Sequence, residues 1–164
     1  KDAMTRSSNY AISQFESVKN YIKLLRVNKP IHIGETGWAS ISSDNYGQNG
    51  TRAADEYKQY LYYSNMIDYG KKNNISIFYF SAFDEPWKDF NNPNGSENHF
   101  GLFTVDGRAK YAMWKNLDKG LLNGLGRNGL EVSKTYRGKR KNMMIDVLTP
   151  NKKNKWRNWL FLRL

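Results

Sequence analysis

Two stretches of this chain place charged side chains directly after apolar runs, where they could serve catalysis. Glu35 follows the apolar residues 31–34 in the stretch KPIHIGETGW, and Asp84, Glu85 and Lys88 follow the run ISIFYFSAF. A carboxylate at the end of a buried run is costly unless it is paired, so each one needs a reason. A catalytic site is one reason, because carboxylates in clefts act as nucleophiles and proton donors. A structural role, with loop amides satisfying both carboxylates, fits the spacing equally well.

The elements that must position these side chains alternate between helix and strand. Apolar residues at spacings of four and three, from Ala11 through Phe15 and Val18, predict a helix that ends near Leu25. Residues 31–34, bounded by proline and glycine, predict a short buried strand. Further helices are predicted at residues 53–72 and 109–122, a strand buried on both faces at residues 75–83, and loops at residues 40–51 and 84–103.

This order predicts an α/β fold with a parallel sheet and helical crossovers, either open or closed into a barrel. Functional residues of such folds lie at the carboxyl ends of the strands. Glu35 and residues 84–88 should therefore meet at one edge of the sheet. Gly34 and Gly37, on either side of Glu35, are both expected to give the backbone room to turn there.

Composition narrows the possible functions. The chain has 164 residues, an aromatic fraction of 15%, no cysteine and two histidines. It is long enough for one domain with a core, but shorter than the roughly 250 residues of an eight-stranded α/β barrel. The absence of cysteine excludes disulfides, thiolate metal sites and a cysteine nucleophile. Two histidines are too few for an obvious metal cluster, so we expect no metal and no cofactor.

Charge divides the chain into two predicted parts. The net charge is +11, and residues 124–164 hold 11 of the 26 basic side chains but only two of the 15 acidic ones. Residues 1–123 are therefore predicted to form the folded body, and residues 124–164 a basic tail with a short β segment before a disordered or truncated end. For the final residues a solvated terminus is preferred over a nucleic-acid contact or a membrane-facing element, so no nucleic-acid partner is expected. No apolar run approaches the roughly 18 residues of a membrane span.

Three motifs carry a resemblance to a known family. PIHIGETGW is followed by FYFSAFDEPWK and then by ENHFGLFTVDGRAKY. In this order, over residues 10–122, they resemble the C-terminal part of glycoside hydrolase family 17, the β-1,3-glucanases and related glucanosyltransferases. The resemblance implies a TIM (β/α)8 barrel, of which this chain would supply about the last two βα units, followed by the short basic tail.

The resemblance also implies roles for individual residues. In the family, the glutamate of the E-x-G-W motif is the nucleophile of a retaining double displacement, and the matching position here is Glu35. The family also places an acidic residue and a lysine near that nucleophile, and Glu85 and Lys88 are the candidates at the matching positions here. Lys88 would help to keep Glu35 ionised. The predicted substrate-binding residues are Trp38, Glu85, Trp87, Lys88 and Glu97.

Several assignments stay open at this point. Trp38 could offer a flat apolar face to a sugar ring, or it could be a packing residue at the barrel rim. Asp84 and His99 are expected to hold their loop rather than to contact sugar, and His32 to be a core or rim histidine. Ser81 stands where bacterial members of the family commonly have a glutamate, which leaves the details of one subsite open.

The resemblance also points to a partner that this chain does not supply. A retaining mechanism needs a second carboxylic acid about 5 Å from the nucleophile, which the family takes from an Asn-Glu pair after its fourth strand. No such strand precedes residue 10, so we expect a fragment of a longer enzyme that is inactive alone. The alternatives are a β-1,3-glucanosyltransferase and a non-catalytic carbohydrate-binding remnant. β-Glucan is the expected partner, and this substrate class implies an extracellular, periplasmic or cell-surface location.

Overall fold

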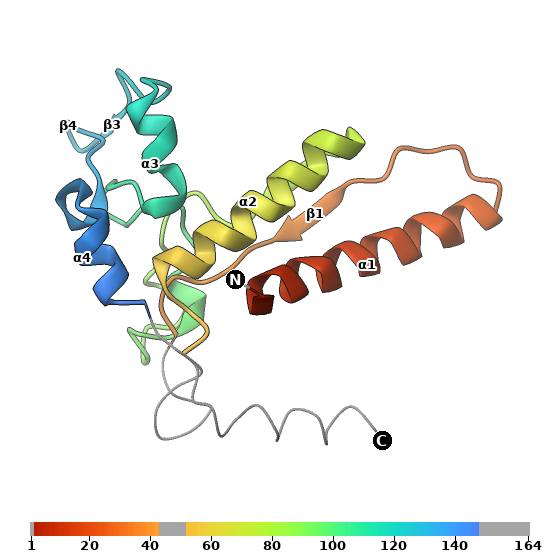
Figure 1. Ribbon diagram of the computed structural model, residues 1–164, viewed down its shortest axis with the longest axis horizontal. Helices are drawn as coiled ribbons and strands as arrows, with labels where there is room; N and C mark the ends of the chain where they lie inside the picture. Colours follow the sequence, from red (N-terminus) through yellow and green to blue (C-terminus); the bar gives the residue numbers. More distant parts are fainter. Residues whose placement is uncertain (1, 43–51, 148–164) are drawn as a thin grey trace.

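The computed structural model describes residues 2–42 and 52–147 of the chain (Figure 1). From the first helix to the third, the longer elements alternate between helix and strand, which confirms the predicted order. Parts of two predictions, the loop at residues 43–51 and the end of the basic tail at residues 148–164, lie outside the described residues. The elements are α1 (Asp2–Leu24), β1 (Ile33–Thr36), α2 (Glu56–Asn73), β2 (Ile77–Tyr79), α3 (Tyr111–Asp118), β3 (Gly126–Arg127), β4 (Leu130–Glu131) and α4 (Arg140–Ile145), with 3-10 helices at Ser96–Asn98 and Thr135–Gly138.

Strands β1 and β2 form a parallel pair, as predicted, but β1 begins two residues later than the predicted strand. Pairing starts at Ile33, whose N–H donates to the carbonyl of Ser76 (3.1 Å). It continues past the predicted end, since the N–H of Phe80 donates to the carbonyl of Thr36 (2.8 Å). Glu35 therefore lies inside the strand rather than after it. In the register, Ile33 faces Ile77 and Thr36 faces Tyr79.

The prediction that the second strand is buried on both faces is wrong for the described chain. Phe78, at the centre of β2, is 64% exposed. Its neighbours Ile77 and Tyr79 pack against the cluster around Met66, which α1 and α2 form together. Successive strand side chains point to opposite faces, so burial of both faces requires a packing layer on each side. In the described residues, helices cover only one.

Helix α1 is longer than its predicted stripe and less buried. It begins at Asp2 and lies along α2 (Figure 1), against which it buries Met4 and Phe15. The ring of Phe15 packs edge to face on Tyr69 of α2, with centroids 6.3 Å apart. Val18, by contrast, is 51% exposed, so the predicted apolar stripe is only partly covered. None of the described helices is both long and apolar enough to cross a membrane.

Helix α2 starts where a capping residue stops the preceding loop. The side chain of Asp55 accepts a hydrogen bond from the N–H of Lys58 (2.8 Å), the usual way to satisfy a free amide in the first turn. At the other end Asn74 adopts a left-handed conformation, which favours asparagine or glycine. The helix predicted at residues 53–72 is thus confirmed within three residues at each end.

A second cluster joins α3 to α4. It contains Trp114 and Met143, which are 6% and 1% exposed. Helix α3 is shorter than predicted, because Gly120 turns the chain at a φ of +71°. The apolar residues near Met144 belong to helix α4 and not to a β segment, while a short antiparallel hairpin, β3 and β4, precedes them. The division of the chain at residue 123 stays a prediction.

Candidate active site

Glu35 points away from the packed layers. Its side chain is exposed and has no hydrogen bond or ion pair with the residues that the structure describes. In the part of the chain that the structure describes, the carboxylate is thus not buried, since helices cover only one face of β1. His32, expected in the core or at its rim, is exposed as well.

The end of β1 touches the end of β2 at a glycine. A Cβ placed on Gly37 would overlap the carbonyl oxygen of Phe80 and lie 3.2 Å from Cδ1 of Phe100. Gly34, on the other side of Glu35, has nothing within 4 Å of the same position. The two glycines therefore differ: Gly37 allows a close backbone contact, and Gly34 stands in open space.

Phe80 links this contact to the predicted residues of the second loop. The ammonium of Lys88 lies 4.0 Å from the centroid of the Phe80 ring, within the range of a cation–π interaction. The same ammonium pairs with Oε2 of Glu85 at 3.2 Å. Glu85 and Lys88 are thus brought together. They lie next to Phe80, which follows β2 and contacts Gly37 at the end of β1. Lys88 pairs with Glu85 rather than Glu35, so its influence on Glu35 stays a prediction.

The three other predicted residues lie in different surroundings. The indole of Trp38 packs on Tyr62 with centroids 5.2 Å apart, and its N–H donates to the carbonyl of Ala53 (2.9 Å). This environment favours the packing alternative for Trp38. Trp87 is 64% exposed and therefore has more free ring surface. Glu97 is exposed in the 3-10 helix Ser96–Asn98.

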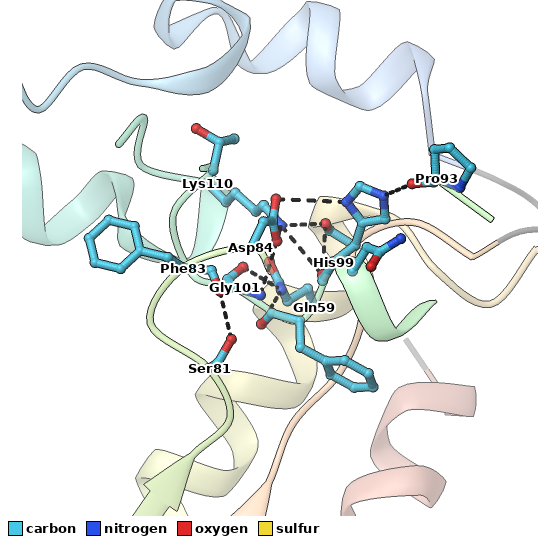
Figure 2. Close-up of polar contacts among 12 residues, drawn as sticks. Gln59, Ser81, Phe83, Asp84, Pro93, His99, Gly101 and Lys110 are labelled. Atoms are coloured by element: carbon cyan, nitrogen blue, oxygen red, sulfur yellow. Dashed lines mark hydrogen bonds and ion pairs between the residues drawn. The ribbon is translucent and has the colours of Figure 1, made fainter. Parts of the chain in front are cut away.

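A buried ion pair lies beneath these loops (Figure 2). The ammonium of Lys110 donates to Oδ1 of Asp84 at 2.6 Å, and the two residues are 2% and 8% exposed. Burial lowers the pKa of Lys110, while the carboxylate of Asp84 opposes that shift. Nε2 of His99 donates to the carbonyl of Pro93 (2.8 Å), and its Nδ1 is 3.8 Å from Oδ2 of Asp84. These contacts agree with the predicted role of Asp84 and His99 in holding their loop, while the absence of sugar contact stays a prediction.

A buried glutamine ties the same loops from α2. Nε2 of Gln59 donates to the carbonyls of Trp38 (3.0 Å), Phe100 (3.2 Å) and Gly101 (2.9 Å). Gln59 is fully buried. Sequence reasoning missed both Gln59 and Lys110. For Gln59 the one available signal was a polar residue on the same helix face as Tyr62 and Met66, and such a pattern is too common to single out. The hydroxyl of Ser81 donates to the carbonyl of Phe83 (2.8 Å), while its backbone N–H donates to the carbonyl of Phe100 (3.2 Å).

A second buried carboxylate lies at the start of α2. Oε2 of Glu56 accepts hydrogen bonds from the N–H of Tyr111 and from Oγ1 of Thr135, both at 2.8 Å. Burial raises the pKa of Glu56 above its ordinary value, although these two hydrogen bonds and the charge of Lys110 oppose the shift. Glu56 therefore joins α2, α3 and the 3-10 helix Thr135–Gly138.

Replacing Glu56 by glutamine should make the chain less sensitive to pH. A carboxyl whose pKa is raised on folding stabilises the fold at low pH, and that contribution is lost as the pH rises through the folded pKa. The amide oxygen of glutamine can accept both hydrogen bonds without a charge. We expect Glu56→Gln to melt at the wild-type temperature near pH 4 and at a higher temperature near pH 7. If the variant and the wild type melt at the same temperature at pH 7 as well as at pH 4, the prediction is contradicted.

Comparisons with known proteins agree with the motifs. The model of the family described as glycosyl hydrolases family 17 matches residues 25–114. The glucan 1,3-beta-glucosidase of Arthroderma benhamiae is 38% identical over 88 residues, which are 49% of this chain and 27% of that protein. The acidic isoform PR-O of glucan endo-1,3-beta-glucosidase from Nicotiana tabacum is 34% identical over 97 residues, 52% of each chain. The chain thus spans at most about half the length of these curated relatives.

Solved structures show the same relationship. An endo-laminarinase from Formosa Hel1_33_131 matches with a TM-score of 0.83 and 54% identity over 90% of this chain and 38% of its own. A Rhizomucor miehei beta-1,3-glucanosyltransferase, solved as an active-site mutant with laminaritriose, matches with a TM-score of 0.52 and 28% identity over 66% of this chain and 36% of its own. Since the family model covers more than half of the residues, this chain belongs to glycosyl hydrolases family 17.

Proposed function

We propose that this chain is the C-terminal part of a TIM-barrel glycoside hydrolase that cleaves β-1,3-glucan with retention, and that it supplies about the last two of the eight βα units. One observation carries the proposal: an exposed glutamate on β1 lies beside a strand end that bears a Glu85–Lys88 ion pair, in a family 17 chain 54% identical to an endo-laminarinase. Carboxyl ends of parallel strands are where barrel enzymes hold their catalytic groups.

The proposed chemistry is a double displacement on Glu35. Its carboxylate attacks the anomeric carbon while an acid on the opposite side protonates the leaving oxygen, and water then releases the sugar. That acid belongs about 5 Å from Glu35, and we assign it to a part of the barrel outside this chain. Glu85 and Lys88 are suited to bind sugar hydroxyls. Trp87 is better placed than Trp38 to stack on a sugar ring, because more of its surface is free.

We infer where the enzyme acts from the class of its proposed substrate. A β-1,3-glucan polymer would reach the enzyme from outside the cell that degrades it, so the enzyme would act in the extracellular space, in a periplasm or at a cell surface. The laminaritriose complex of the Rhizomucor protein supports the class of sugar, because that protein is a glycoside hydrolase family 17 enzyme as well.

The same Rhizomucor protein favours a second candidate, glucanosyl transfer. Transfer and hydrolysis share the first displacement on Glu35 and differ in whether a sugar hydroxyl or water resolves the glycosyl-enzyme. Incubation with laminari-oligosaccharides separates the two, since transfer yields products longer than the substrate. A carbohydrate-binding remnant would yield no products at all.

The test uses a hybrid enzyme in which this chain replaces the matching part of the Formosa endo-laminarinase, 38% of that protein. The remaining laminarinase segment then supplies the rest of the barrel. We expect the hybrid to release reducing ends from laminarin, with β-anomers appearing first by NMR. A folded hybrid without activity would contradict the proposal, and so would α-anomers, because they indicate inversion.

The purified 164-residue chain is expected to be inactive on laminarin. Removing the acid/base of a glycosidase typically costs several orders of magnitude in rate, even when the nucleophile is present. The measurement is reducing-end release over hours at high protein concentration, with the hybrid as positive control. More than one turnover per chain would contradict the assignment of the acid to another segment.

A further inference from the structure

Lys110 lies at the junction of the two loops that carry the predicted site. It precedes α3, and its N–H donates to the carbonyl of Leu102 (3.0 Å). Its ammonium, in a residue only 2% exposed, has three acceptors: Oγ of Ser40 and Oδ1 of Asp84, both at 2.6 Å, and the carbonyl of His99 at 3.4 Å (Figure 2). Burying a lysine is costly, so all three contacts contribute to keeping it there.

The three acceptors come from both loops. Ser40 belongs to the segment after β1, two residues beyond Trp38. Asp84 directly precedes Glu85 in the segment after β2, and His99 lies two residues beyond Glu97 in the same segment. A single ammonium therefore fixes the loop that follows Glu35 to the loop that contains the other predicted residues.

We propose that Lys110 is a positioning residue, which holds the loops after β1 and β2 in register so that Glu85 and Lys88 face the sugar bound at Glu35. This inference rests on the proposed function and deepens it. Lys110 itself does not contact substrate, because its ammonium is buried and fully engaged within the protein.

The partners of Asp84 show how the position is passed on. Oδ1 of Asp84 accepts the N–H of Gly101 (3.1 Å) as well as the ammonium, which brings the two ends of the second loop together. A Cβ on Gly101 would overlap the backbone of Phe83 and Asp84, so the approach is close. The next residue, Glu85, donates its N–H to the carbonyl of Asn98 (3.1 Å). A shift of Asp84 would thus move Glu85 directly.

Hydrogen bonds within the loop after β2 make it rigid, so a shift of Asp84 is passed on to the rest of the loop. The side chain of Asn98, 1% exposed, accepts the N–H of Asp89 (2.8 Å) and donates to the carbonyls of Asp89 (2.9 Å) and Asn92 (3.0 Å). Asn98 thus ties the later part of the loop to residues 89–92. A displacement of Asp84, at the start of the loop, is therefore expected to move the whole segment. A displacement of about 1 Å at a catalytic centre can cost about a hundredfold in rate.

The test separates positioning from simple charge balance. Lys110→Met in the hybrid enzyme leaves the carboxylate of Asp84 buried without its cation, and we expect both the melting temperature and kcat/KM to fall. The double variant Lys110→Met/Asp84→Asn removes the buried charge, so the melting temperature should recover. We expect its kcat/KM on laminari-oligosaccharides to stay about ten- to a hundredfold low, mostly through kcat, because neither new side chain bridges Ser40 to residue 84. Recovery of kcat/KM together with the melting temperature would overturn the proposal.

A second measurement is independent of catalysis. In the 164-residue chain, Lys110→Met should make hydrogen exchange faster than in the wild type in residues 37–42 and 80–103, and should change it less in α2. Lys115→Met, the same change at an exposed position of α3, should leave exchange at the wild-type rate. Equal exchange in the loops of wild type and Lys110→Met would overturn the loop-holding role. If the parent hybrid is inactive, the proposed function fails and the exchange result alone decides the role of Lys110.

Discussion

Replacing Glu35 by glutamine in the hybrid enzyme should lower laminarin hydrolysis by about a thousandfold or more, while the melting temperature changes little. An amide has the size of the carboxylate but cannot form the glycosyl-enzyme intermediate. Because the side chain is exposed and has no described partner, its charge contributes little to the packing of this chain. The loss should fall on kcat, measured as reducing ends released from saturating laminarin.

The matched control is Glu131→Gln, the same substitution at an exposed glutamate of β4. It should retain the parental rate. A second control distinguishes a missing nucleophile from a disturbed site: azide should restore cleavage of an aryl β-glucoside by Glu35→Ala. Azide would attack the anomeric carbon as the phenol leaves, giving the α-glycosyl azide. A Glu35→Gln enzyme that keeps its rate would make Glu35 a structural carboxylate and remove the nucleophile from the proposal.

Alanine at Gly37 should destabilise the chain by about 3 kcal/mol, the upper range for an overpacked site. The added methyl group would overlap the carbonyl oxygen of Phe80, and that backbone cannot move freely because its N–H is bonded to Thr36. Displacing Phe80 would also disturb Lys88, whose ammonium lies over its ring. The free energy of unfolding, measured in urea, and kcat/KM of the hybrid should therefore fall together.

Gly34→Ala provides the matched control, three positions before Gly37 in the same stretch. Nothing lies within 4 Å of its Cβ position, so the substitution should change the free energy of unfolding by no more than about 1 kcal/mol. Similar stabilities of the two variants would show that the contact of Gly37 with Phe80 yields easily. A stable Gly37→Ala enzyme with reduced activity would place the effect on the site instead of the fold.

The sequence was sufficient for the order of elements and for the parallel pairing of the two strands that lead to the predicted site residues. Hydrophobic periodicity and loop composition are local signals, and the order of helices and strands that they predict agrees with the structure. Strand ends were less predictable, because the pairing of Ile33 with residue 77 depends on a distant strand. Burial was harder still: the exposure of Phe78 depends on which layers cover β2, and no pattern in its own segment reports that.

The site shows the same division between local and distant information. Asp84 could be given a structural role from its place beside Glu85 in the motif. Lys110 could not, because a lysine directly before a helix is usually solvated. Its role depends on acceptors 26 and 70 positions away in the sequence. The choice between packing and sugar contact for Trp38 likewise required the position of Tyr62.

The shared anchoring of the two loops limits how this domain can be redesigned. Specificity is often changed by grafting a loop from a relative, on the assumption that each loop is an independent module. Here Lys110 and Gln59 each bond to both loops. A segment grafted after β2 would therefore have to fit against residues 38–40 as well as against these two side chains. A successful exchange would have to transplant both loops together with these two side chains, as a single inherited unit.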